Sequence, residues 1–154
     1  MHPNNNVGYL LQHVAITMAR QNDQVLQERL GIGFSQFKIL MVLERSPHIQ
    51  QRQIADALGQ TEASISRQIR LMIDKSLLQS TVSPHNRREH ITTPTTKGIR
   101  LAEEAMEVLN TFHSPMFERL SEKQQEQFVE ILKNMHECIC QAGKTSACDR
   151  PFNT

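Results

Sequence analysis

Apolar residues recur at approximately helical spacing over the first long segment of the chain, from Gly8 to Leu30. This pattern predicts a helix. Gly31 and Gly33 are suited to end it, because glycine adopts the left-handed conformation of a helix C-terminus without strain. A second helix is expected to follow, with Ser35 as its N-cap. The apolar positions of that helix are Phe37, Ile39, Leu40 and Leu43.

Two shorter amphipathic segments come next, at about Gln51–Leu58 and about Glu62–Lys75. Gly59 and Gln60 are expected to form a tight turn between them, and Thr61 is a favourable N-cap for the second segment. Two short helices joined by a glycine-containing turn are the signature of a helix-turn-helix. The expected buried positions of the second helix are Ile65, Ile69, Met72 and Ile73.

The pattern then changes to short stretches that contain Thr, Val and Ile, at Leu77–Ser83 and His90–Thr93. The polar turn between them contains the adjacent residues Arg87 and Arg88. These features predict a β-hairpin, or wing, with positive charge at its tip. Pro94 is expected to stop the second strand, because proline cannot donate a hydrogen bond to a strand ladder.

Two further helices are predicted after the wing. One begins at about Lys97 behind a cap at Thr95, and the other covers about 122–141 behind a cap at Ser121. The pair Ser114–Pro115 is expected to interrupt or kink the first of them. The apolar face of the last helix contains Phe128, Ile131, Leu132, Met135 and Ile139.

These elements predict a mainly α-helical protein with a small β-hairpin wing, in which a winged helix-turn-helix is flanked by helices at both ends. Residues 35–96 would form the DNA-binding region, residues 8–34 and 97–142 the dimerisation helices, and residues 143–154 a flexible tail. A second copy of the chain would cover the apolar surface of the flanking helices. The alternative is a monomer whose terminal helices pack on each other.

Composition and charge narrow the class of protein. The 154 residues are 38% hydrophobic, which is ordinary for a globular protein, and no apolar run is long enough to cross a bilayer. The N-terminal residues lack the layout of a secretory signal, so a cytoplasmic location is expected. The net charge is only +1, but residues 61–97 contain six Lys or Arg against three Asp or Glu. Positive charge is therefore expected to concentrate on the helix-turn-helix and the wing.

Serine and arginine side chains are expected on the exposed side of the second helix of the pair. Arginine can donate two parallel hydrogen bonds to guanine, and serine can bond a base edge or a phosphate. An arginine at the tip of the wing is narrow enough to enter the minor groove. For any single arginine the simpler alternative is a solvated charge with no partner. The residues predicted to contact DNA are Gln51, Arg52, Thr61, Ser64, Ser66, Arg67, Arg70, Arg87 and Arg88.

At these residues the sequence resembles the MarR family of bacterial regulators. The resemblance is carried by residues 51–59, by Thr61–Arg67, by Asn86-Arg87-Arg88 and by Thr95-Thr96-Lys97-Gly98, and the element order matches over about residues 8–142. It implies a homodimer that binds pseudo-palindromic double-stranded DNA and represses transcription. It also implies release from DNA by a small aromatic or lipophilic effector or, in other members, oxidant sensing through a cysteine.

Three positions depart from the family pattern. Asn86 stands where an aspartate is usual, and an asparagine can hydrogen-bond a neighbouring arginine but cannot form an ion pair with it. Pro94 replaces a leucine and removes a backbone donor at the end of the strand. Ser76 replaces a glycine, which is costly if the backbone there has a positive φ.

The cysteines Cys138, Cys140 and Cys148 all lie near the C-terminus, which is typical of reduced thiols rather than of a disulfide framework. His136 and Cys140 are four residues apart on one helix and could bind the same metal ion, but two protein ligands do not make a metal site. No metal and no cofactor are expected. A redox switch that uses these thiols is an alternative to effector control, and the simplest expectation is that Cys138 and Cys140 are small buried apolar residues.

Two other functional classes compete with a DNA-binding regulator. The chain has no Gly-rich phosphate loop, no Gly-x-Ser-x-Gly elbow and no His-Glu-x-x-His motif, so no sequence feature favours an enzyme. A winged-helix module that binds another protein is the second rival, because a fold alone does not determine function. Leu71, if exposed, would favour that rival, whereas Arg67 and Arg70 favour DNA.

Overall fold

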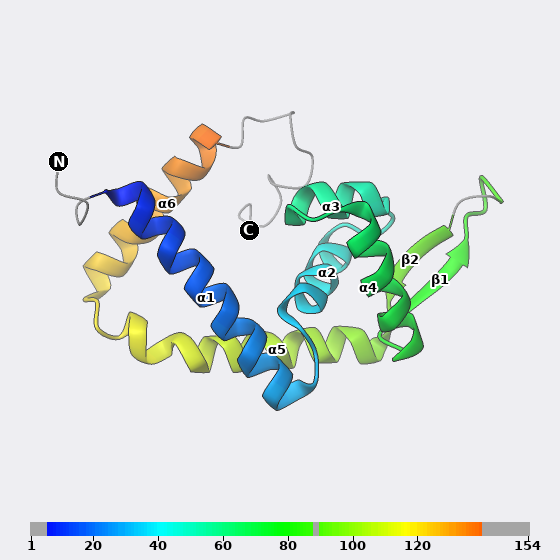
Figure 1. Cartoon of the computed structure of the whole chain (residues 1–154), viewed down its shortest axis with the longest axis horizontal. Coiled ribbons are helices and arrows are strands. Elements are labelled where there is room, and N and C mark those ends of the chain that lie inside the picture. The colour runs from blue at the N-terminus through cyan, green and yellow to red at the C-terminus, as the bar shows by residue number, and fades with distance from the viewer. Residues whose placement is uncertain (1–5, 88–89, 140–154) are drawn as a thin grey trace.

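The computed structural model describes residues 6–87 and 90–139. In these residues six helices and one two-stranded hairpin occur in the order that a winged helix-turn-helix requires (Figure 1). The elements are α1 (Val7–Leu30), α2 (Phe34–Arg45), α3 (Gln51–Leu58), α4 (Glu62–Asp74), β1 (Leu78–Val82), β2 (His90–Pro94), α5 (Thr96–Phe117) and α6 (Glu122–Ile139). The predicted fold class, mainly α-helical with a β-hairpin wing, is confirmed.

The ends of α1 and α2 are set by both local and distant caps. Asn6 Oδ1 accepts a hydrogen bond from the backbone N–H of Tyr9, and Gly31 closes α1 with a φ of 66°. The prediction that Ser35 caps α2 is wrong. The N-cap residue is Gly33, and the N–H of Phe34 donates to Asp23 Oδ1 of α1 at 2.9 Å. A carboxylate from α1 thus takes the place of a local capping side chain.

The helix-turn-helix follows the predicted boundaries to within one residue. The N–H of Gln50 donates to Gln53 Oε1 at the start of α3, and Gly59 ends α3 with a φ of 60°. Thr61 caps α4 as predicted, since its Oγ1 accepts from the N–H of Ser64 at 3.2 Å. The α4 helix ends at Asp74, one residue earlier than expected.

The hairpin is antiparallel and pairs Leu78 with Pro94 at its base and Val82 with His90 at its outer end. Pro94 is the last residue of β2 rather than a stop before it, because a proline at the end of a strand has no ladder bond to lose. Thr95 joins the hairpin to α5. Its Oγ1 donates to the carbonyl of Ser76 at 2.7 Å and accepts from the N–H of Gly98 at 3.1 Å.

The expected interruption at Ser114–Pro115 is wrong, because α5 continues through Pro115 to Phe117. Proline removes one helical hydrogen bond, and so close to the end of the helix that single loss is tolerated. Ser121 caps α6 as predicted: its backbone N–H donates to Gln124 Oε1 at 2.9 Å, and its Oγ accepts from the N–H of Gln124 at 3.3 Å.

The hydrophobic core is built from α1 to α5 and the base of β1, with Leu26 of α1, Leu40 of α2, Ile54 of α3 and Ala105 of α5 all buried in it. Ile65, Ile69 and Met72 of α4 are buried as predicted, whereas Ile73 is only partly buried. In contrast, α6 buries none of its described residues. Figure 1 shows α5 running from the hairpin under α2 and α1, after which α6 turns back toward the beginning of α1. None of the helices described here has the length and apolar composition that a membrane span requires.

Candidate nucleic-acid interface

The α4 helix divides its side chains between the core and solvent as the sequence predicts. Ile65 and Ile69 face inward, and this orientation leaves Arg67 and Arg70 exposed. Ser64 and Ser66 are partly exposed beside them. The first turn of α4 also has N–H groups without helical acceptors, which favours a phosphate at that end. This exposed side of α4 therefore combines arginine and serine donors on one rigid helix.

The α3 helix lies beside α4 and is held by the burial of Ile54 and Ala55. At its start Gln51 is partly exposed and Arg52 is exposed, next to the capping contact between Gln50 and Gln53. Gln51 and Arg52, which were predicted to contact DNA, thus lie at the N-terminus of α3, outside the buried core.

The wing packs against α4 through β1 and projects away from the helices in Figure 1. Ser83 is buried at the end of β1, and its Oγ accepts from the backbone N–H of His85 at 3.3 Å, which shapes the turn. Arg87 is exposed as expected, whereas Arg88 lies outside the described residues. The hairpin therefore presents Arg87 to solvent, on an element that packs against α4.

Two lysines included in the predicted positive excess serve the fold instead. Lys97 Nζ donates to the carbonyl of Lys75 at 2.9 Å, and Lys75 Nζ donates to the carbonyl of Gly31 at 3.3 Å. Both ammonium groups therefore bind backbone carbonyls at the C-terminal ends of α1 and α4. The exposed arginines that the structure describes on α4 and the wing are Arg67, Arg70 and Arg87, and that these residues form a DNA interface stays a prediction.

Two side-chain contacts that the sequence did not suggest connect α2 with the helix-turn-helix. Gln36 Nε2 donates to Gln68 Oε1 of α4 at 3.0 Å. Ser35 Oγ lies 2.9 Å from Nε2 and 3.1 Å from Oε1 of Gln60, in the turn before α4. The one signal in the sequence was a glutamine, Gln36, among the apolar positions of α2.

A half-buried lysine, Lys38, lies on α2 with its Nζ 5.1 Å from the centre of the Phe34 ring. Desolvation by burial holds the pKa of Lys38 below its ordinary value of 10.5. A cation over an aromatic face gains a modest electrostatic attraction. This lysine was not among the predicted site residues.

A polar contact joins α1 to α5 at their crossing. His113 Nε2 lies 2.6 Å from Oδ1 of the buried Asn22. Desolvation by burial holds the pKa of His113 below its ordinary value of 6.5, so the neutral ring, with Nε2–H donating to Asn22, is the favoured form.

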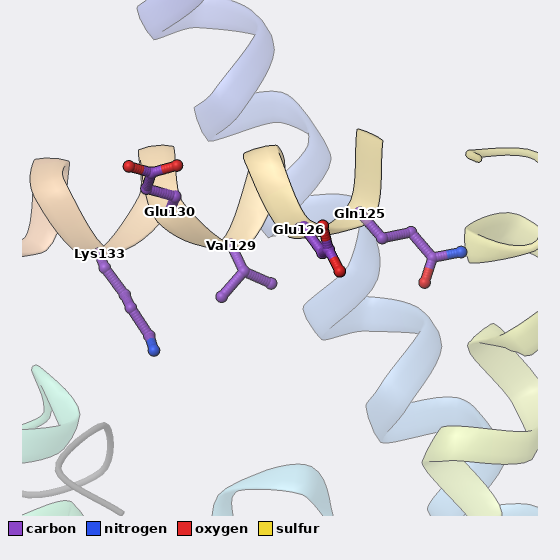
Figure 2. A pocket seen from close by; sticks show the side chains of 5 residues that line it. All are labelled: Gln125, Glu126, Val129, Glu130 and Lys133. Atoms are coloured by element: carbon purple, nitrogen blue, oxygen red, sulfur yellow. The ribbon is translucent and has the colours of Figure 1, made fainter. Parts of the chain in front are cut away.

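Of the three C-terminal cysteines, Cys138 lies within the described residues. Cys138 is exposed on α6, so the expectation that it is a buried apolar residue is wrong for the single chain, and Cys140 and Cys148 lie outside the described residues. Among residues 6–87 and 90–139, no three His, Cys, Asp or Glu side chains are grouped as metal ligands. A hollow beside α6 is lined by Gln125, Glu126, Val129, Glu130 and Lys133, all from that one helix (Figure 2).

Comparison with known proteins gives a consistent result. A sequence model of the MarR family matches residues 30–89, which span α2, the helix-turn-helix and β1. No curated protein matches the chain. Among solved structures, apo MarR from E. coli superimposes with a TM-score of 0.74 at 19% identity, covering 84% of this chain and 96% of that one.

Two other solved structures were determined with bound molecules. A Mycobacterium tuberculosis MarR family protein in complex with p-aminosalicylic acid has a TM-score of 0.72 at 24% identity, covering 84% of this chain and 97% of that one. An S. aureus MepR mutant bound to an oligodeoxyribonucleotide has a TM-score of 0.57 at 27% identity, covering 86% of this chain and 97% of that one.

Proposed function

Because residues 30–89 match the MarR family and the chain has the fold of solved MarR-family regulators, we propose that this protein is a sequence-specific DNA-binding transcriptional regulator. The resemblance recognised in the sequence is confirmed. MarR-family members are transcriptional regulators rather than enzymes. The observation that supports DNA binding here is the exposure of Arg67 and Arg70 on the side of α4 opposite its buried face.

In this proposal α4 enters the major groove. Arg67, in the N-terminal half of α4, donates to base edges, while Ser64, Ser66 and Arg70 contact bases or phosphates. Gln51, Arg52 and Thr61 hold the phosphate backbone at the N-termini of α3 and α4. Arg87, together with Arg88, reaches the minor groove from the wing. Residues 35–96 thus form the DNA-binding region.

The terminal helices support a homodimer. Large apolar side chains remain exposed on α1, the second half of α5 and α6, with Ile131 of α6 at 54%. Many exposed apolar side chains on the terminal helices favour a subunit interface there. Residues 8–34 and 97–142 would therefore pair with a second copy, and residues 143–154 would remain a tail. A symmetric dimer places two α4 helices on the two halves of a pseudo-palindromic operator.

We propose a small aromatic acid as the effector. The M. tuberculosis relative binds p-aminosalicylic acid, and Lys38 of this chain offers a half-buried cation beside the Phe34 ring. We infer that the protein acts in the cytoplasm as a repressor and leaves DNA when such an acid binds. Two alternatives are a redox switch at Cys138, Cys140 or Cys148 and a protein-binding role in which the exposed Leu71 (44%) contacts a partner.

Fluorescence anisotropy tests the DNA-binding proposal. A labelled duplex from the protein's own upstream region is compared with a scrambled duplex, over about 50 to 200 mM salt. We expect tight, steeply salt-dependent binding to the native duplex. Arg67→Ala is expected to weaken it by about 1–3 kcal/mol, while the matched control Arg29→Ala, on α1, leaves it unchanged.

The other outcomes of this titration are equally clear. Equal and weak binding to both duplexes would contradict operator specificity in that region. If neither duplex binds at the lowest salt concentration, the DNA-binding proposal is wrong and the protein-binding role takes precedence. If DNA affinity falls on oxidation in the wild type but not in Cys138→Ser, the redox alternative replaces the effector.

A further inference from the structure

Gln36 is a polar residue in an apolar environment. Only 8% of its surface is exposed, and Phe37, Ile39 and Leu40 beside it on α2 are all buried. Its Nε2 donates to Gln68 Oε1 on α4 at 3.0 Å, whereas its Oε1 accepts no hydrogen bond from any residue that the structure describes. A buried amide oxygen without a donor lowers the stability of the folded state.

Packing alone gives no reason for an amide at this position. An apolar side chain of similar length would fill the same space without leaving a buried oxygen unpaired. An amide differs from such a side chain because its hydrogen bond is directional: the bond requires a short distance and an aligned donor. A buried polar pair can select one register between two helices where apolar packing alone admits more than one. The bond to Gln68 therefore favours a single rotation of α4.

A second contact restrains the same helix at another point. Ser35, the neighbour of Gln36, holds the side-chain amide of Gln60, which directly precedes the α4 cap Thr61. Gln60 and Gln68 are about two helical turns apart along α4. The first turn of α2 is itself anchored to α1, since the N–H of Phe34 donates to Asp23. A helix held at two such points cannot easily rotate about its own axis.

We propose that Ser35 and Gln36 are positioning residues that set the rotation of α4, and with it the direction in which Arg67 and Ser64 meet the bases. This inference rests on the proposed function. According to this proposal, the first turn of α2 helps the protein to discriminate between DNA sequences and does not affect its affinity for DNA of any sequence. Phosphate contacts tolerate a small rotation of the helix, whereas bidentate contacts to base edges do not.

The test compares operator binding with scrambled-duplex binding for Gln36→Met, Gln68→Met and the double variant. Each single variant is expected to lower the ratio of the two affinities about tenfold, with scrambled-duplex affinity unchanged. The double variant should be no worse than either single variant, because both remove one hydrogen bond. The matched control is Gln24→Met, at an exposed glutamine of α1 whose side chain donates to Glu28 of the same helix.

Two further measurements distinguish a loss of overall stability from a loss of the orientation of α4. The melting temperature of Gln36→Met is expected to equal or exceed that of the wild type, because the unpaired buried oxygen is gone. Ser35→Ala, at a partly exposed position, removes the second contact without touching the core and should lower the affinity ratio in the same direction. Hydrogen exchange of residues 62–74 should become faster in both variants, while exchange in α5 stays the same.

An unchanged affinity ratio in Gln36→Met and Ser35→Ala would overturn the proposal, even if α4 exchanged faster. If the wild type shows no preference between the two duplexes, the proposed function fails instead, and hydrogen exchange alone decides whether these residues hold α4. Unchanged exchange in residues 62–74 overturns the proposal whether or not DNA is bound.

Discussion

Gly98, in the first turn of α5, lies directly against the backbone carbonyl of Leu77. A Cβ at Gly98 would collide with the Leu77 carbonyl oxygen, and Leu40 Cδ2 lies only 3.2 Å from the same point. The same carbonyl oxygen accepts a hydrogen bond from the N–H of Thr95 at 3.0 Å. It therefore cannot move away without breaking this bond, which links the base of the hairpin to the start of α5. The glycine of the family motif is therefore required by close packing.

Gly98→Ala is expected to destabilise the fold by about 2 kcal/mol or more, because a methyl group is forced against rigid backbone. Urea unfolding followed by circular dichroism measures the change. The matched control is Gly8→Ala, whose Cβ would meet only Asn6 Oδ1 at 3.4 Å and which should be neutral or slightly stabilising. Equal stability of the two variants would show that the packing at Gly98 is looser than described.

Ser76 has a φ of 60°. This is the positive backbone angle at which a serine is expected to destabilise the fold relative to a glycine. Ser76→Gly is expected to stabilise the fold by about 0.5–1 kcal/mol, because glycine adopts this conformation without strain. The contact made there by Thr95 uses the carbonyl of Ser76 and survives the change. Thermal unfolding provides the measurement. Ser80→Gly, on the exposed side of β1, serves as the control and should be destabilising.

His113 predicts a pH dependence of stability. Its pKa is below 6.5 in the folded protein because the ring is desolvated, so the unfolded state binds more protons at acidic pH. The stability contributed by the neutral ring is complete above about pH 6.5 and is lost as the pH falls toward the folded pKa.

Urea titrations between about pH 5 and about pH 8 should show a smaller acid loss in His113→Gln than in the wild type. The control His90→Gln replaces an exposed histidine of β2 and shows whether the effect is specific to the position of His113. Identical profiles for the wild type and His113→Gln would mean that the burial of His113 does not make stability depend on pH in this way.

Lys38 is expected to bind the carboxylate of an aromatic effector. Lys38→Met should raise the concentration of p-aminosalicylic acid needed for release from DNA at least about tenfold, since a charge-assisted hydrogen bond is lost. Lys123→Met, at an exposed position of α6, is the control. For the wild type, m-aminophenol, which lacks the carboxylate, should be a poor effector. If Lys38→Met responds as the wild type does, the acid binds elsewhere or not at all.

Elements with strong local signals were predicted well from the sequence. Glycine at the ends of α1 and α3, the caps at Thr61, Thr95 and Ser121, and the apolar spacing of α4 are local features, so a single sequence contains the information. The exposure of Arg67 and Arg70 followed from the spacing of α4, and that of Arg87 followed from its place in the polar turn of the predicted hairpin. That these residues contact DNA remains a prediction.

Features that depend on distant partners were missed. Ser35 does not cap α2 because Asp23, from another helix, already accepts the N–H of Phe34 and leaves the Ser35 hydroxyl to Gln60. Lys75 and Lys97 bind carbonyls that only the folded chain brings within reach. The bond between Gln36 and Gln68 joins residues 32 positions apart, which no helical or strand period can reveal.

The absence of any buried side chain on α6 ties the structure of this helix to the amount of protein present. A helix of this length gains little stability in water unless its apolar face is covered. If a second copy covers it, folding of α6 and association are one equilibrium, and dilution shifts both together. The cellular concentration would then determine how many chains have a complete C-terminal half as well as how many are bound to an operator.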